Sequence, residues 1–177
     1  MSARRPQAEP TADSDALRLL SRRPLTVFEL RQRLERRGHA PAAVEGACSR
    51  MRDAGYLDDR RLALDFIVTR AARLGHGPER MIEALCARGI DRGIADSALQ
   101  AAVTSGDLSP CEVLRRRIAR AVRGATPPLE RREYARVYNA LRRAGFDEES
   151  IRQELEPFQA PAPPADSTAD EATDDFA

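Results

Sequence analysis

Two adjacent carboxylates, Asp58 and Asp59, are the first residues of this chain that could do chemistry, as a general acid and base or as ligands of a divalent ion. Neighbouring side chains on a helix point about 100° apart, so the two carboxylates would not converge on one atom. The positions one turn further on hold Leu62 and Ala63, which supply no third ligand. An acid that precedes an apolar run is typical of a helix N-cap. We therefore interpret the pair as caps between two helices.

The other candidate nucleophiles and ligands stand alone in the sequence. His39 and His76 lie beside glycines in expected turns, and Cys48, Cys86 and Cys111 are far apart, without a C-x-x-C spacing. No G-x-S-x-G, phosphate-binding loop or dinucleotide fingerprint occurs. The sequence thus predicts no enzyme, no metal site and no cofactor, and its odd, unpaired cysteines favour the reducing cytoplasm.

Arginine dominates the charged residues, since all 29 basic residues are Arg and none is Lys. The net charge of +1 conceals an asymmetry, because residues 159–177 contain five acids and no base. The remaining 158 residues therefore carry a formal charge of +6. We expect a basic folded body followed by an acidic tail.

Residues 115–123 (RRRIARAVR) hold five of these bases and no acid. Pairs such as Glu112 with Arg116, four residues apart, would explain part of the stretch as an ordinary solvated face. The excess of guanidinium groups also fits a surface for nucleic acid or an acidic protein, and both interpretations stay open here. The candidate contact residues are Arg60, Arg61, Arg70, Arg73, Arg80, Arg115, Arg116, Arg117 and Arg120.

The composition favours helices. Apolar residues make up 42% of the chain, but there are only eight aromatic residues and no Trp, so the core must consist of Leu, Ala, Ile and Val. The N-terminus has no apolar signal region and no stretch approaches the ~18 apolar residues of a membrane span, so we expect a soluble protein.

Helix start signals recur along the chain at regular intervals, with glycines after each expected helix. An opening helix is expected at about 14–22. Later starts are indicated at Thr26, Pro41, Asp58 or Asp59, Pro78, Asp91, Ser109, Thr126-Pro127 and Asp147. Thr26-x-x-Glu29 and Ser109-x-x-Glu112 have the pattern of capping boxes. Tyr56 and Leu57 are expected to pack as a hydrophobic staple near Leu62 or Leu64.

A repeat underlies these nine expected helices. Segments 30–38 (LRQRLERRG), 81–89 (MIEALCARG) and 137–145 (VYNALRRAG) each have an apolar residue, a second one four residues on, and Gly four beyond that. We predict an all-α tandem array of three three-helix repeats, at 13–57, 58–105 and 109–158, elongated or curved. Residues 1–12 and the acidic tail, 159–177, are expected to be disordered.

Three stretches together resemble the RecX family of bacterial regulators of the recombinase RecA. They are residues 16–38 (ALRLLSRRPLTVFELRQRLERRG), 55–66 (GYLDDRRLALDF) and 69–90 (TRAARLGHGPERMIEALCARGI). Residues 135–151 (ARVYNALRRAGFDEESI) look like that family's closing repeat, so the resemblance covers nearly all of residues 14–158.

The resemblance implies a helical-repeat protein that binds the RecA nucleoprotein filament and inhibits ATP hydrolysis, strand exchange and coprotease activity. It would thereby modulate recombination and the SOS response. The expected partner is the RecA filament, with weak or indirect contact with DNA and no contact with a membrane. The protein itself is expected to be a cytoplasmic monomer. A helix-turn-helix-like DNA-binding regulator and a general helical-repeat scaffold are the alternative hypotheses.

Overall fold

The computed structural model describes residues 11–159, except for the side chains of residues 70–72. The predictions for residues 1–12 and for the acidic tail therefore fall almost wholly outside the described residues. The described chain is helical without any strand. Its elements are α1 (Ala12–Leu20), α2 (Val27–Glu35), α3 (Pro41–Asp53), α4 (Asp59–Asp65), the π-helix η1 (Phe66–Ala71), α5 (Ala72–Leu74), α6 (Pro78–Cys86), α7 (Arg92–Thr104), α8 (Pro110–Ala121), α9 (Arg131–Arg143), α10 (Glu148–Leu155) and the 3₁₀ turn η2 (Glu156–Phe158).

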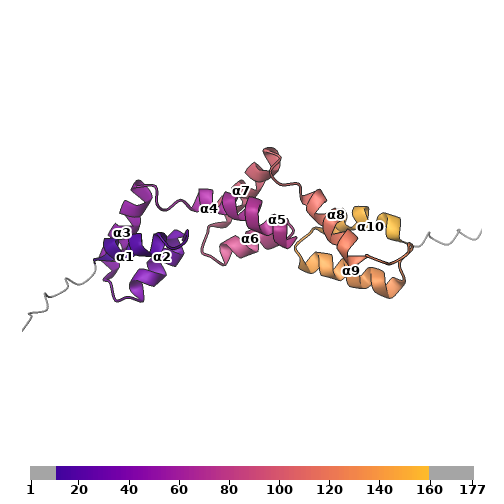
Figure 1. The fold of residues 1–177 in the computed structure, drawn as a ribbon, viewed down its shortest axis with the longest axis horizontal. Coiled ribbons are helices and arrows are strands. Elements are labelled where there is room, and N and C mark those ends of the chain that lie inside the picture. The colour runs from indigo at the N-terminus through magenta and orange to yellow at the C-terminus, as the bar shows by residue number, and fades with distance from the viewer. Residues whose placement is uncertain (1–10, 160–177) are drawn as a thin grey trace, which may run out of the picture.

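Three groups of helices follow one another along the long axis of the molecule, α1–α3, then α4–α7, then α8–α10 (Figure 1). Because α4, η1 and α5 follow one another without a break, they act as one helix, so each group has three helices in the described chain. This confirms the predicted all-α array of three-helix repeats. We call the groups the first, second and third repeat; the residue boundaries assigned from the sequence stay predictions.

The buried apolar residues form two clusters. One takes its members from the first repeat, between Ala12 and Leu57. The other runs through the second and third repeats, from Ala63 to Leu155. The first repeat thus has a core of its own, whereas the other two share one.

Several predicted caps are confirmed. At the start of α2, the Thr26 hydroxyl accepts the Glu29 N–H at 3.0 Å, and the Thr26 N–H donates to the Glu29 carboxylate at 3.4 Å, which completes the capping box. Asp58 is the N-cap of α4 and accepts the Arg61 N–H at 3.0 Å. At α8 only one half of the expected box forms, with Ser109 accepting the Glu112 N–H at 3.3 Å.

The predicted start of a helix at Thr126-Pro127 is wrong, because α9 begins at Arg131. Pro128 follows Pro127, and a residue that precedes proline is driven out of the α conformation. The segment instead contacts the turn after α10, where the Leu129 N–H donates to the Phe158 carbonyl at 2.9 Å.

A buried carboxylate ties the first repeat together. Asp15 on α1 accepts hydrogen bonds or ion pairs from Arg18 at 2.7 Å, Arg37 at 2.7 Å and His39 at 3.0 Å. The hydrogen bond with His39 and the charges of the two arginines outweigh burial and lower the pKa of Asp15. The turn between α2 and α3 is thereby fixed against α1.

Hydrogen bonds at equivalent positions join successive repeats. At the first junction, between repeats one and two, the Thr26 hydroxyl donates to the Arg88 carbonyl at 2.7 Å. At the second junction, between repeats two and three, the Gly77 N–H donates to the Ala144 carbonyl at 2.7 Å. In the repeat alignment Thr26 corresponds to Gly77, and Arg88 to Ala144. At both junctions, therefore, the start of the second helix of one repeat contacts the glycine turn that ends the second helix of the following repeat.

Glycine is required where these turns are covered. A Cβ on Gly89, whose φ is +80°, would lie 2.3 Å from Cγ of Phe28. A Cβ on Gly77 would lie 2.4 Å from the backbone of Gly145. No described atom lies within 4 Å of such a Cβ on Gly38, the corresponding glycine of the first repeat.

Charged groups reinforce the first junction. Arg88 donates to both carboxylate oxygens of Glu29, at 3.0 and 3.2 Å. Burial opposes ionisation of Glu29, but the hydrogen bond and charge of Arg88 prevail and its pKa is lowered. Asp59 accepts the Val27 N–H at 3.1 Å. Its pKa is raised, chiefly by burial.

The staple expected at this junction stays a prediction: Tyr56 and Leu62 line a common hollow, but the neighbouring leucines belong to different clusters. Leu57 is buried in the first cluster, whereas Leu62 and Leu64 pack against the second. Tyr56 is 60% exposed. The polar contacts of Thr26, Glu29 and Asp59 join the first two repeats directly.

Candidate partner-binding surface

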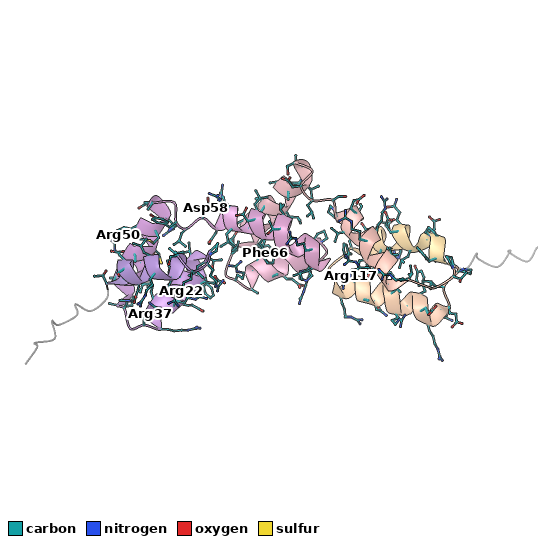
Figure 2. All side chains as sticks on the ribbon, viewed as in Figure 1. Arg22, Arg37, Arg50, Asp58, Phe66 and Arg117 are labelled. Carbon is teal, nitrogen blue, oxygen red and sulfur yellow. The ribbon has the colours of Figure 1, made fainter. Side chains whose placement is uncertain are left out.

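Four of the predicted contact residues meet at the second junction. Arg73 lies on α5, and three more arginines lie on α8: Arg116, Arg117 and Arg120. Together with Gly75 and Val113 they line a hollow of about 230 Å³, which we call the cationic hollow. Figure 2 places Arg117 where the middle group of helices meets the last one.

The amphipathic pattern of α8 explains this gathering. Val113, Leu114 and Ile118 are buried, which turns the opposite face of the helix to solvent. Arg116 and Arg120 are four residues apart, so they lie one above the other on that face. The structure thus brings together the basic run that the sequence singled out and an arginine from the preceding repeat.

Arg117 has a structural task within the hollow. Its Nη1 donates to the Gly75 carbonyl at 2.9 Å and to the Leu74 carbonyl at 3.4 Å. Carbonyl groups at the end of a helix lack intrahelical donors, and a cation there also complements the helix dipole. Arg117 therefore caps α5 and holds α8 against the second repeat.

The hollow contains more positive than negative charge. Arg116 pairs with Glu112 at 3.3 Å, while Arg73 and Arg120 form no ion pair with any described residue. The pKa of nearby His76 is lowered, by burial first and then by the charges of Arg80 and Arg117. Guanidinium groups in this arrangement suit carboxylate or phosphate oxygens, which they bind through two parallel N–H groups.

The other predicted arginines lie elsewhere. Arg60 and Arg61 line a separate, largely apolar hollow of about 560 Å³ between α4 and α7, together with Leu64, Ile94 and Asp91. Arg80 pairs with Glu83 at 3.0 Å, and Arg115 pairs with Glu154 at 2.8 Å. The side chain of Arg70 is not among those described. The nine arginines thus form no single face, and their contact with a partner stays a prediction.

Arginines on the third helix of each repeat are neutralised by acids. Arg50 pairs with Asp13 at 2.9 Å, Arg52 with Glu45 at 3.6 Å, Arg92 with Glu79 at 3.0 Å and Arg152 with Glu148 at 3.2 Å. These four are the only basic residues of α3, α7 and α10. A helix that reads the major groove would present such groups to phosphates and bases.

Sequence reasoning missed the role of Arg88, which bonds to Glu29 across the first junction. The available signal was the capping-box Glu29, because a carboxylate beside a helix start attracts a cation from a neighbouring element. Within residues 11–159 no group of three or more His, Cys, Asp and Glu side chains could hold a metal ion. Asp58 and Asp59 are both occupied with backbone N–H groups. No helix in the described part of the chain is long and apolar enough to cross a membrane.

Comparison with known proteins gives a consistent result. Residues 14–51 match the family model described as "RecX, first three-helix domain", and residues 58–99 match "RecX, second three-helix domain". "Regulatory protein RecX" of Halorhodospira halophila is 38% identical over 137 residues, which cover 77% of this chain and 81% of that protein. Its counterpart from Chromohalobacter salexigens is 33% identical over 83% of this chain and 92% of that protein.

Two solved structures resemble the fold. "Crystal structure of regulatory protein RecX" has a TM-score of 0.70 at 23% identity and covers 82% of this chain and 70% of that one. The crystal structure of RecX from Lactobacillus salivarius has a TM-score of 0.66 at 18% identity, covering 83% and 94%.

Proposed function

This chain belongs to the RecX family of regulatory proteins, and from that premise we propose that it regulates the recombinase RecA by binding the RecA nucleoprotein filament. Binding would inhibit ATP hydrolysis, strand exchange and coprotease activity of RecA, and so modulate recombination and the SOS response. Such inhibition needs no catalytic group. We place the protein in the cytoplasm, where this partner acts.

The cationic hollow is the observation that carries the proposal. Arg73, Arg116 and Arg120 are exposed there at the joint between two repeats, and within the described residues only Arg116 has an ion pair, with Glu112. A filament presents acidic protein surface and DNA phosphates, and both are ligands of guanidinium groups. An elongated array can engage several filament subunits at once, so weak contacts add through effective concentration.

The test is DNA-dependent ATP hydrolysis by the cognate RecA at increasing concentrations of this protein. We expect the wild type to suppress hydrolysis. The double variant Arg116→Glu with Arg120→Glu should need about a tenfold higher concentration, since two reversed contacts of roughly 0.7 kcal/mol each amount to about 1.4 kcal/mol. Unchanged hydrolysis at saturating protein would show the proposal to be wrong.

A matched control carries the same change of charge elsewhere on the third repeat. Arg131 and Arg132 are exposed in the first turn of α9, where acids are favourable to the helix dipole. Arg131→Glu with Arg132→Glu should leave inhibition within about twofold of the wild type. An equal loss in both double variants would mean that total charge, rather than the hollow, governs binding.

A helix-turn-helix-like regulator remains the alternative. The pairing of every basic residue on α3, α7 and α10 argues against it. Sequence-specific retention on duplex DNA without RecA would favour this alternative, whereas weak DNA binding that disappears with salt agrees with phosphate contacts alone.

A further inference from the structure

The cationic hollow and the acidic end of the same chain are complementary in charge. The hollow is lined by four arginines and no acid, and among residues 11–159 only Glu112 forms an ion pair with one of them. Residues 159–177 contain five acids, Asp166, Asp170, Glu171, Asp174 and Asp175, and no base. We propose that residues 170–175 of the free protein dock on the cationic hollow and compete there with an anionic partner.

The contacts of the third repeat set an upper limit on the distance to be bridged. Gln159 Nε2 donates to the Tyr134 hydroxyl at 2.6 Å, which places the end of the described chain beside α9. From Tyr134 to Ala144 the helix rises about 15 Å. The Ala144 carbonyl then contacts the Gly77 N–H, and two further residues, at most about 7 Å, lead to Gly75, whose carbonyl binds Arg117. With side-chain lengths and the two hydrogen bonds added, this path is about 43 Å long, which is an upper limit on the distance between Gln159 and the hollow.

The acidic residues have the chain length to reach that far. Asp170 lies 11 residues beyond Gln159 and Asp175 lies 16 beyond it. Fully extended chains of these lengths span about 36 and 53 Å. Asp174 and Asp175 therefore reach the hollow even at the upper limit, whereas Asp170 needs a somewhat shorter distance. Asp166, only seven residues on, reaches about 23 Å and is left out of the proposed segment for that reason.

The hollow of Arg60 and Arg61 is a poorer match for this segment. Arg61 lies 14 residues before Gly75 along the α4–α5 helix, which adds about 21 Å to the path. The upper limit becomes about 64 Å, so the segment is assured of reaching the cationic hollow but not this one. Asp91 also lines that hollow and would repel an incoming carboxylate.

Tethering makes a weak contact effective. Ion pairs between exposed side chains are individually weak and are screened by salt. A short linker raises the local concentration of the segment to the millimolar range, so a contact with a millimolar dissociation constant would be about half occupied. The docked segment would occupy Arg73, Arg116 and Arg120, the groups offered to a partner. This regulatory consequence rests on the proposed function, whereas the docking itself does not.

Paramagnetic relaxation in the full-length protein tests the docking without RecA or DNA. Cys111 is exposed in the first turn of α8, on the helix that supplies the hollow, and takes a nitroxide label in a Cys86→Ser background. Cys48 is buried and the pKa of its thiol is raised, so it stays unlabelled. We expect the amide signals of residues 170–175 to lose at least about half of their intensity at low salt, and to recover at about 0.5 M salt.

Two kinds of variant separate docking from mere tethering. Arg116→Glu with Arg120→Glu should restore the signals, and Arg60→Glu with Arg61→Glu, the matched control, should not. Removing three of the segment's four negative charges, with Asp170→Asn, Asp174→Asn and Asp175→Asn, should largely restore them as well, without any change in residues 11–159. Far-ultraviolet circular dichroism verifies that each variant keeps its helices.

Two results would overturn the proposal. Equal broadening in the wild type and in the variant with three of the segment's four acids neutralised would show that the tether alone keeps the segment near the label. Signals restored only by the change at Arg60 and Arg61 would place the segment in the other hollow. Neither result bears on RecA inhibition, so failure of this inference is distinguishable from failure of the proposed function.

Discussion

Replacing Gly89 by Ala should weaken the first junction more than the backbone alone explains. The backbone at Gly89 has a φ of +80°, and Gly38 and Gly124 have nearly the same values, +86° and +83°. The left-handed conformation costs a residue with a Cβ about 1–2 kcal/mol. Gly38→Ala and Gly124→Ala, which meet no described atom within 4 Å, should lower the free energy of unfolding by that amount only.

At Gly89 a steric cost is added. The new Cβ would meet three atoms of Phe28, its Cβ, Cγ and Cδ1, at 2.3–2.5 Å. Overpacking of this kind typically costs a further 1–3 kcal/mol, so Gly89→Ala should lower the free energy of unfolding by about 2–5 kcal/mol. Urea unfolding followed by far-ultraviolet circular dichroism measures the difference from the two control variants.

A double-mutant cycle tests the cause. The partner change must be Phe28→Gly, because Cβ of Phe28 is itself one of the clashing atoms. In that background Gly89→Ala should lower the free energy of unfolding only by the cost of the left-handed backbone conformation. The coupling free energy between the two substitutions should then be about 1–3 kcal/mol. A coupling below about 0.5 kcal/mol, the usual error of additivity, would refute the reasoning. Since the two buried clusters are separate, a weakened junction should also make the first repeat unfold in its own transition.

Three further predictions concern single side chains. Arg117→Ala should lower the free energy of unfolding by about 1–2 kcal/mol, because the carbonyls at the end of α5 lose their donor, whereas Arg120→Ala should change it by less than about 0.5 kcal/mol; urea unfolding compares the two. The pKa of Asp15 is lowered, by the hydrogen bond with His39 above all. Its ionised form therefore stabilises the fold above the unfolded pKa of about 3.9, and that stability is lost as the pH falls through the folded pKa. The difference in urea unfolding midpoint between the wild type and Asp15→Asn should shrink below about pH 4. Burial raises the pKa of Asp59, so its charge costs stability at pH 7. Asp59→Asn keeps an acceptor oxygen for the Val27 N–H and should be no less stable than the wild type, whereas Asp59→Ala should be less stable by about 1 kcal/mol. Thermal unfolding compares the three proteins.

The helices could be predicted because their signals are local. Thr26, Asp58, Asp91 and Asp147 each accept an N–H from the first turn of the helix that they precede, and the pattern alone indicated this. The repeat could be predicted because apolar residues and glycines recur in register. At Thr126-Pro127 the local rule failed, since the effect of Pro128 on the residue before it was overlooked.

The joints between repeats could not be predicted in the same way. A capping box predicts that Thr26 bonds to Glu29, but not that its hydroxyl also donates to a carbonyl 62 residues away. The cationic hollow was partly foreseen, because the basic run on α8 is local. The position of Arg73 beside it depends on how two repeats dock, and helical periodicity says nothing about that.

The early start of α9 determines at which end of the array a further repeat could be added. Helices α2 and α6 begin three residues before Leu30 and Met81, whereas α9 begins six residues before Val137, the residue aligned with them. At each junction the start of a helix in one repeat contacts the glycine turn of the next repeat. In the third repeat the extra turn of α9 stands at that position, so the glycine turn of a fourth repeat after α10 would collide with it. A copy of the second repeat placed before α1 would instead find Gly38, whose turn no described atom covers. An engineered longer protein should therefore be lengthened at its N-terminal side.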